Sequence, residues 1–298
     1  MNLGYACINT ALSANKIMTN RTMRRKTFDA KGIDYVSDLA LLNVKDLKTI
    51  VQWNNEMGIK LFRLSSQIFA WSDEYKLSDL KDYDEICSMM LEIGKIATNA
   101  NQRLTMHPGP YNCLASPNQK VVEKTIRELN CHSEQFNMLG FKPSNYNKIN
   151  IHVGGAYGDK KGTLERFCKN FDLLNEDTKK RLVIENDDSP NEYSVKDLFD
   201  GIYQTIGIPI TFDYFHHKFN TGGLTEEEAL KMAAITWPDG ITQCCHYSES
   251  RRKEKLDESI RPQAHSDLIY EKIQTYGLEP DIVIEAKLKE QAIFKRVI

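Results

Sequence analysis

Residues 182–217 read LVIENDDSPNEYSVKDLFDGIYQTIGIPITFDYFHH and contain the repeating unit that decides the fold. A short apolar run at 182–186 is followed by an amphipathic segment at 195–206, which begins after the helix-capping residue Ser194. A second apolar run follows at 210–215. A strand, a helix and another strand in this order predict parallel strands joined by a crossover helix.

The same alternation continues along the whole chain. The expected strands are 3–7, 60–65, 103–107, 148–153, 182–186, 210–215, 242–247 and 281–286. Further expected helices are 84–99, 121–139 with Gly140 at its C-terminal cap, and 226–234 after Thr225. Eight strand-helix units in 298 residues predict one α/β domain, a single (β/α)₈ TIM barrel over residues 1–298, because such a barrel typically takes about 250 residues. The longest non-periodic stretches, 9–31 and 248–262, both follow strands and are expected at the C-terminal face.

Composition narrows the class of protein. The chain is 41% hydrophobic and 27% charged, as in ordinary soluble globular proteins. It has no run of eighteen apolar residues and no secretory signal pattern at its start, so we expect an intracellular protein, in the cytoplasm or wherever its partner resides. A net charge of −2 means that any nucleic acid would be held by a local basic patch. Seven cysteines without a C-x-x-C pair indicate core thiols, not disulfides.

Side chains that bind metals stand at the ends of six consecutive expected strands. They are His107, His152, Glu185, Asp213 with His216 close behind, His246 and Glu285. Any one of them taken alone would more readily be interpreted as a core or rim polar group with satisfied hydrogen bonds, since an ionisable group in an apolar frame is costly to bury unpaired. Strand ends converge on one ring around a barrel mouth, however, so the set predicts a metal site at the C-terminal face.

The ligand chemistry indicates more than one ion. Mixed imidazole and carboxylate ligands suit Zn²⁺, Mn²⁺ or Fe²⁺ better than Ca²⁺ or Mg²⁺, and the set is too large for a single ion. Two or three divalent ions are therefore expected. Such a cluster is suited to in-line displacement at phosphorus, which favours hydrolysis of a phosphate ester. A metal-assisted sugar isomerisation could use the same ligands and stays open at this point.

Nine strings in order along the chain carry a resemblance to a known family. They are LGY at 3–5, NRTMR at 20–24, LFRLSS at 61–66, MHPG at 106–109, HVGGAYG at 152–158, END at 185–187, DYFHH at 213–217, RPQAH at 261–265 and EAKLKEQ at 285–291. With these strings the chain resembles the UV damage endonucleases, which are relatives of endonuclease IV.

The resemblance implies an enzyme of DNA repair that uses divalent ions, most often Mn²⁺ with Zn²⁺, Co²⁺ or Mg²⁺ as alternatives. It would cut double-stranded DNA immediately 5′ of a UV photoproduct, leaving a 3′-hydroxyl and a 5′-phosphate, without an obligate protein partner. The implied ligands are His107 and His152 for one ion, Asp213, His246 and Glu285 for a second, Glu185 as a bridge, and His216 and His265 for a third. The candidates for a direct catalytic role are Glu185, Glu285, His107 and Asp213.

The chain departs from the family pattern at three positions. Cys244 stands where the resemblance implies a lysine that can be carboxylated and join the metal cluster. Its thiolate could act as a soft ligand, or the residue could be an inert core cysteine. Pro110, before Tyr111, replaces a glutamine of a Gln-Tyr pair thought to probe the lesion, and Gln67 stands where some members have a further histidine ligand.

Basic and aromatic residues follow the expected strands and are candidates for DNA contact. The loop at 20–26 is rich in basic residues, and we expect its Arg21 and Arg24 to contact phosphates, whereas Lys253 in the second basic segment is expected to be a solvated surface residue. The remaining candidates are Tyr5, Asn9, Tyr111 and Tyr157. The tyrosines could stack on unpaired bases or could instead pack at the rim. A lesion-directed endonuclease explains both the metal ligands and the basic loops. A sugar isomerase would explain the ligands but not the basic loops, and a non-enzymatic DNA-binding protein would explain the loops but not the ligands.

Overall fold

The computed structural model describes residues 1–295 and contains one eight-stranded parallel barrel. Its strands are β1 (Leu3–Ala6), β2 (Leu61–Leu64), β3 (Arg103–Met106), β4 (Ile149–Ile151), β5 (Leu182–Glu185), β6 (Ile210–Thr211), β7 (Cys244–Tyr247) and β8 (Asp281–Ile284). Neighbouring strands pair in chain order from β1 to β6, and β1 also pairs with β8, which pairs with β7. A single parallel bridge between Asp213 and His246 joins the two ends of the sheet, so the barrel is nearly closed. Every strand lies inside its expected range, which confirms the predicted fold class.

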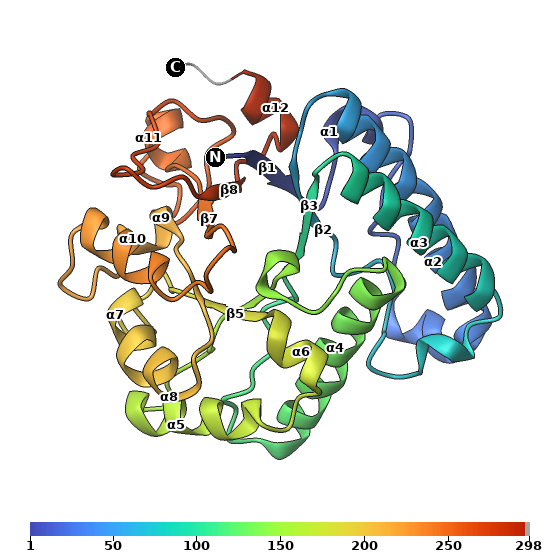
Figure 1. Ribbon diagram of the computed structural model, residues 1–298, viewed down its shortest axis with the longest axis horizontal. Coiled ribbons are helices and arrows are strands. Elements are labelled where there is room, and N and C mark those ends of the chain that lie inside the picture. Colours follow the sequence, from blue (N-terminus) through green and yellow to red (C-terminus); the bar gives the residue numbers. More distant parts are fainter. Residues whose placement is uncertain (296–298) are drawn as a thin grey trace.

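Helices surround the ring of strands on the outside (Figure 1). The α-helices are α1 (Thr10–Ser13), α2 (Arg25–Glu56), α3 (Tyr83–Asn99), α4 (Gln119–Met138), α5 (Lys160–Phe171), α6 (Glu176–Arg181), α7 (Val195–Leu198), α8 (Gln204–Ile206), α9 (Tyr214–His217), α10 (Glu226–Ala234), α11 (Arg251–Lys255) and α12 (Glu290–Phe294). Short 3₁₀ turns lie at Leu77–Asp79 and Asn145–Asn147, and a π-helical turn at Phe199–Tyr203 joins α7 to α8. None of the helices in residues 1–295 is both long and apolar enough to cross a lipid bilayer.

Local capping explains where several helices begin and end. Ser194 and Thr225 each accept a backbone hydrogen bond from the third residue of the helix that follows, and a carboxylate at that residue completes a capping box. Gly140, just past α4, has a φ of +77°, the left-handed conformation that ends helices and favours glycine. The helix expected at 195–206 is present but is interrupted by the π-helical turn.

Three expectations about element boundaries were wrong. The sixth strand was expected to reach residue 215, but it ends at Thr211 because Asp213 accepts the backbone N–H groups of Phe215 and His216 and so starts α9. The stretch 9–31 was expected to be irregular, yet the 32-residue helix α2 already begins at Arg25. Gly32, with a φ of 65°, has a non-helical backbone conformation and kinks α2 near its beginning. The stretch 248–262 likewise contains the short helix α11.

A buried arginine lies at the N-terminal end of the barrel. Arg103, the first residue of β3, donates to the carbonyls of Tyr146 (2.6 Å) and Thr242 (2.8 Å) and forms an ion pair with Asp281 at 3.1 Å. The guanidinium is satisfied on several sides, as a buried charge must be.

Candidate metal centre

Glu185, the last residue of β5, lies at the centre of the mouth and is almost fully buried. One carboxylate oxygen, Oε1, is 3.0 Å from Nδ1 of His246. The other, Oε2, is 3.2 Å from Nε2 of His107 and accepts a hydrogen bond from the amide of Asn150. A single carboxylate thus faces ligand-type nitrogens from two directions, which is the arrangement of a bridging ligand.

Two more histidines face the same carboxylate from its open side. Nε2 of His152 is 3.9 Å from Oε2 of Glu185, and Nδ1 of His216 is 3.5 Å from Oε1. The ligand atoms of His107, Glu185 and His246 lie within 4.8 Å of one another, as do those of His152, Glu185 and His216. These two trios share Glu185 but divide the histidines differently from the ion assignments that the family resemblance implies, and those assignments remain predictions.

Glu285 and His265 extend the ring toward β8. Glu285 is 3.4 Å from Nδ1 of His246 and 3.9 Å from Nδ1 of His265, and its other close partner is the guanidinium of Arg63. His265 is held next to β7 by an antiparallel bridge to Ser250. Although burial opposes the charged form, Arg63 and His246 hold the pKa of Glu285 well below its usual range, so this carboxylate is ionised. An ionised carboxylate is the form that binds a cation.

Asp213 offers a free oxygen in the same ring. Its Oδ1 accepts the N–H groups of Phe215 (2.7 Å) and His216 (2.8 Å), while Oδ2 is buried and has no hydrogen-bond partner among residues 1–295. Burial raises the pKa of Asp213 to about 7, and the nearby Glu185 and Glu285 add to the rise although His216 opposes it. A buried oxygen without a partner, surrounded by further carboxylates, fits a cation placed between them.

All of the predicted ligand residues therefore converge on one ring. The ring contains nitrogen and oxygen donors, anionic carboxylates that repel one another, and an unpartnered Oδ2 on Asp213. This donor set fits divalent ions of the Mn²⁺ and Zn²⁺ type.

Three supporting residues were missed by the sequence reasoning. Oδ1 of Asp187 is 2.7 Å from Nδ1 of His152, so this carboxylate orients the ring and leaves Nε2 facing Glu185. Asn150 contacts Glu185 directly, and the buried Lys148 contacts Nε2 of His246 at 3.3 Å. Asp187 has a signal in the sequence, since it stands in the END string, whereas Lys148 and Asn150 read as ordinary residues of a buried strand.

Cys244 lies in the barrel interior, where it is buried in a small apolar cluster with Val183, Trp237 and Val283. Its sulfur belongs to neither histidine-glutamate trio. Of the two alternatives, the inert core cysteine agrees with these surroundings, since Cys244 is fully buried.

Some of the residues predicted to contact DNA are buried in the structure and others are exposed. Tyr5 is fully buried: its side chain faces α2, where its hydroxyl donates to Asn54 and accepts from Asn9, which is itself buried. Neither Tyr5 nor Asn9 can touch DNA in this conformation, so both predictions need correction. The physical reason is strand alternation, which turns residue 5 away from the barrel interior while residues 4 and 6 face it.

The two arginines of the first basic loop also differ. Arg21 forms an ion pair with Asp46 at 2.6 Å and donates to the carbonyls of Lys16 and Met18, so its guanidinium holds the loop together and is not free for phosphate. Arg24 is exposed at the start of α2, and no ion pair or side-chain hydrogen bond to it occurs within residues 1–295. The expectation for Arg21 is therefore corrected, and that for Arg24 remains a proposal.

Tyr111 and Tyr157 are on the surface near the centre. Tyr111 is 89% exposed and lines a cavity of 500 Å³, together with Met23 and Trp71. A neighbouring cavity of 290 Å³ is lined by His107, His152 and His216, and the two cavities share Gly109, Pro110 and Asn112. Tyr157 is 52% exposed, and its hydroxyl is 3.4 Å from the sulfur of Cys113. Tyr111 thus projects from the wall between the metal ligands and an adjoining hollow.

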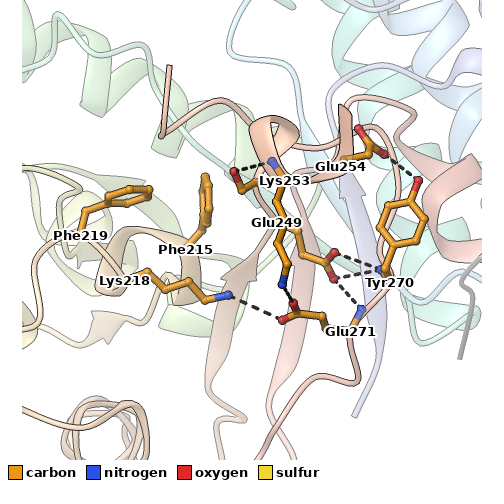
Figure 2. Close-up of a pocket in the computed structure, with 9 residues that line it drawn as sticks. Phe215, Lys218, Phe219, Glu249, Lys253, Glu254, Tyr270 and Glu271 are labelled. Carbon is orange, nitrogen blue, oxygen red and sulfur yellow. Dashed lines mark hydrogen bonds and ion pairs between the residues drawn. The ribbon is translucent and has the colours of Figure 1, made fainter. Parts of the chain in front are cut away.

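A third cavity of 610 Å³ is lined by residues that include Phe215, Lys218 and Glu271 (Figure 2). Phe215 lines it and also packs against the ring of His265, with their centroids 5.7 Å apart. Lys218 and Lys253 both pair with Glu271, at 3.9 Å and 2.6 Å, across the cavity wall (Figure 2). Because Lys253 is exposed and paired in this way, it reads as a surface residue, in agreement with the expectation for this lysine.

Metal binding is expected to release protons at neutral pH. Burial disfavours the charged form of His152, but Asp187 and Glu185 outweigh it and raise the pKa of His152 to about 10. Asp213 and Glu185 likewise raise the pKa of His216 to about 9 against the effect of burial. Both rings are protonated at pH 7 and must lose a proton to bind an ion, so Mn²⁺ affinity should rise from pH 6 to about pH 9. Calorimetric titration of metal-free protein in buffers of different ionisation enthalpy should detect about two protons released at pH 7. Release of none would exclude His152 and His216 as ligands.

Comparison with known proteins agrees with the geometry. The model of the family UV-endonuclease UvdE matches residues 1–297. This chain belongs to that family. It is 38% identical over 304 aligned residues to the UV-damage endonuclease of Schizosaccharomyces pombe, an alignment that covers 98% of the chain but only 49% of the yeast protein. The chain thus spans about half the length of that relative.

Solved structures give the same assignment. The crystal structure of SacUVDE superposes with a TM-score of 0.85 at 30% identity and covers 100% of this chain and 96% of that one. Endonuclease IV from Thermus thermophilus is similar with a TM-score of 0.59 over 100% of this chain and 96% of that one, but at 12% identity it shows a common fold alone.

Proposed function

We propose that this protein is a metal-dependent DNA endonuclease that cuts the strand immediately 5′ of a UV photoproduct and leaves a 3′-hydroxyl and a 5′-phosphate. The observation that carries the proposal is Glu185, shared by two histidine-containing trios at the barrel mouth of a UvdE family member. Double-stranded DNA carrying photoproducts is the proposed partner, inside the cell, with no obligate protein partner.

The residues that would hold the ions are the ring itself. They are His107, His152, Glu185, Asp213, His216, His246, His265 and Glu285. Two or three divalent ions are proposed, Mn²⁺ before Zn²⁺, Co²⁺ or Mg²⁺. When bound, such ions polarise the phosphate, lower the pKa of water and neutralise the leaving oxygen.

The chain's own residues fix the geometry in which this chemistry would occur. Asp187 and Asn150 orient His152 and Glu185 and so keep both ligands aimed at the centre. The exposed Arg24 would contact the DNA backbone, and Tyr111 would stack on or replace bases displaced at the lesion. Of the four proposed catalytic residues, Glu185 and Glu285 are ionised, and Nε2 of His107 lies 3.2 Å from Glu185. Asp213 is bridged to His246, whose ring contacts both glutamates.

The proposal is tested by incubating the metal-loaded protein with a labelled duplex that carries one photoproduct, alongside the same duplex without damage. A single cut immediately 5′ of the lesion is expected with Mn²⁺, with a 3′ end that a polymerase can extend directly. Chelation should abolish the cut and added Mn²⁺ should restore it. Equal cutting of both duplexes, or cutting that survives chelation, would contradict the proposal.

A further inference from the structure

The loop after β8 carries two lysines beside the ring of ligands, and the proposed cleavage chemistry assigns no role to either. Lys287 and Lys289 stand in the string EAKLKEQ, which begins at Glu285. Lys287 is exposed and Lys289 is half-buried. Within residues 1–295 neither amino group forms an ion pair or a side-chain hydrogen bond, and Glu285 pairs with Arg63 instead.

The basic segment at 251–253, which follows the neighbouring strand β7, differs in this respect. Each of its three basic side chains pairs with a carboxylate, at 3.7 Å, 2.9 Å and 2.6 Å in chain order. A phosphate that approached one of them would have to displace that carboxylate, which would stay nearby and repel it. Lys287 and Lys289 offer the same charge without this competition.

The backbone of Lys289 has a conformation that favours glycine. Its φ is 54° and its ψ is −125°, and its N–H donates to the carbonyl of Ala286 at 3.1 Å to close a turn. A residue with a side chain is strained in this region, and such strain is concentrated at functional sites. Glycine would fit this backbone better, which points to a use for the lysine side chain.

The segment that carries both lysines is fastened at each end. The N–H of Lys287 donates to the carbonyl of Ser266 at 2.8 Å, in the loop that also carries His265. At the other end, Glu290 is fully buried and accepts the N–H of Thr10 at 2.9 Å, at the start of α1. The backbone from which the two side chains extend is thus fixed at the mouth, which reduces the cost of ordering them on a ligand.

The charges of the two lysines lie close to one another and to the ring of ligands. Burial lowers the pKa of Lys289, although Cys7 and Glu285 oppose this effect. The positive charges of Arg63 and Lys287 lower it further. Three cations therefore gather around Glu285, and only Arg63 among them is paired with it. Such an excess of positive charge suits a phosphate group.

We propose that Lys287 and Lys289 form a phosphate-binding site on the β8 side of the mouth, which holds the DNA backbone next to the phosphate that is cut. The inference rests on the proposed endonuclease function and adds to it a contact surface outside the ring of ligands. Contacts of this kind position the duplex but carry no sequence information. They release counterions, so they make binding depend on salt concentration.

The test measures binding of Mn²⁺-loaded protein to a fluorescent undamaged duplex over a range of salt concentrations. Each phosphate contact adds about 0.9 to the slope of log affinity against log salt. Lys287→Gln combined with Lys289→Gln should therefore reduce the slope by about 2 and weaken binding about 10-fold at moderate salt. The Mn²⁺ content should not change, because neither lysine belongs to the ring of ligands.

Arg251→Gln combined with Lys253→Gln is the matched control. It removes the same number of positive charges from the loop after β7, but both side chains are already paired with carboxylates. The slope and the affinity should stay near the wild-type values. Thermal unfolding of each variant shows that it is folded.

A second comparison separates the amino group of Lys289 from its backbone. Lys289→Ala and Lys289→Gly both remove the charge, but only glycine relieves the strain at a φ of 54°. The glycine variant should unfold at a higher temperature than the alanine variant, yet both should bind the duplex equally weakly. A stable glycine variant with wild-type affinity for DNA would overturn the role of the side chain.

The remaining outcomes are distinguishable. An unchanged salt slope in the folded Lys287 and Lys289 double variant would overturn the phosphate-binding site. An equal fall in the control variant would also overturn it, since the effect would then come from net charge alone. Wild-type protein that binds no duplex at low salt would instead overturn the proposed function itself.

Discussion

Replacement of Glu185 by glutamine is expected to reduce cleavage of a photoproduct duplex by about 10³-fold while the protein remains folded. Ions in such a centre stabilise the transition state by several kcal/mol, and each 1.36 kcal/mol is about tenfold in rate. Glu185 supplies one oxygen to each trio, so its loss affects both positions together. Glutamine keeps the shape of the side chain and opens no cavity.

The pKa of Glu185 supports this expectation. Burial alone would raise it, yet the surrounding histidines, His246 and His152 foremost, hold the pKa well below its usual range. The carboxylate is therefore ionised throughout the neutral range, and the substitution removes a full negative charge from the middle of the ring. Elemental analysis after reconstitution should find at least two ions per chain in the wild type and fewer in Glu185→Gln.

Glu192→Gln is the matched control for this experiment. Glu192 is a half-buried carboxylate that lines the same 290 Å³ cavity but belongs to neither trio. Its substitution should leave metal content and cleavage close to those of the wild type. Full activity in Glu185→Gln, or an equal loss in both variants, would remove the special role of Glu185.

Replacement of Tyr111 by alanine should lower cleavage of a photoproduct duplex by about 10- to 100-fold without changing metal content. A base stacked on an aromatic side chain gains about 1–3 kcal/mol, and the 89% exposed ring of Tyr111 stands in the wall between two cavities at the mouth. Pro110 offers no side-chain hydrogen bond in place of the glutamine that the family resemblance implies, so we expect Tyr111 to carry a larger share of the proposed wedge function than it does in relatives.

The choice of substrate separates lesion sensing from general DNA binding. A photoproduct must be prised out of the helix, at a cost of a few kcal/mol that is smaller for weakly stacked bases. If this enzyme also cuts an abasic duplex, Tyr111→Ala should lose much less activity there, because less stacking has to be replaced. Tyr111→Phe keeps the ring and should behave as wild type on both substrates. Equal losses on both substrates would assign Tyr111 to general binding, and no loss on either would leave it as a rim residue.

The barrel and the ring of ligands could be predicted from the sequence because both depend on local patterns. Short apolar runs that alternate with amphipathic segments specify strands and helices, and parallel strands bring their C-terminal ends to one mouth. Residues at successive strand ends, such as His152 and Glu185, therefore meet whatever the details of packing. The residues at which strands end were harder to predict from the sequence. The sixth strand, for example, ends early because the side chain of Asp213 caps the helix that follows.

The roles of side chains away from the strand ends were decided only by the tertiary structure. Tyr5 and Arg21 stand in family-like strings, yet contacts with Asn54 and Asp46, far along the chain on α2, turn one inward and tie up the other. Lys148 shows the reverse case, since this residue next to β4 meets His246 of β7 only because the chain closes into a barrel. Sequence periodicity fixes which face of its own element a residue occupies, but the partner on that face comes from another element, and only the folded chain determines which one it is.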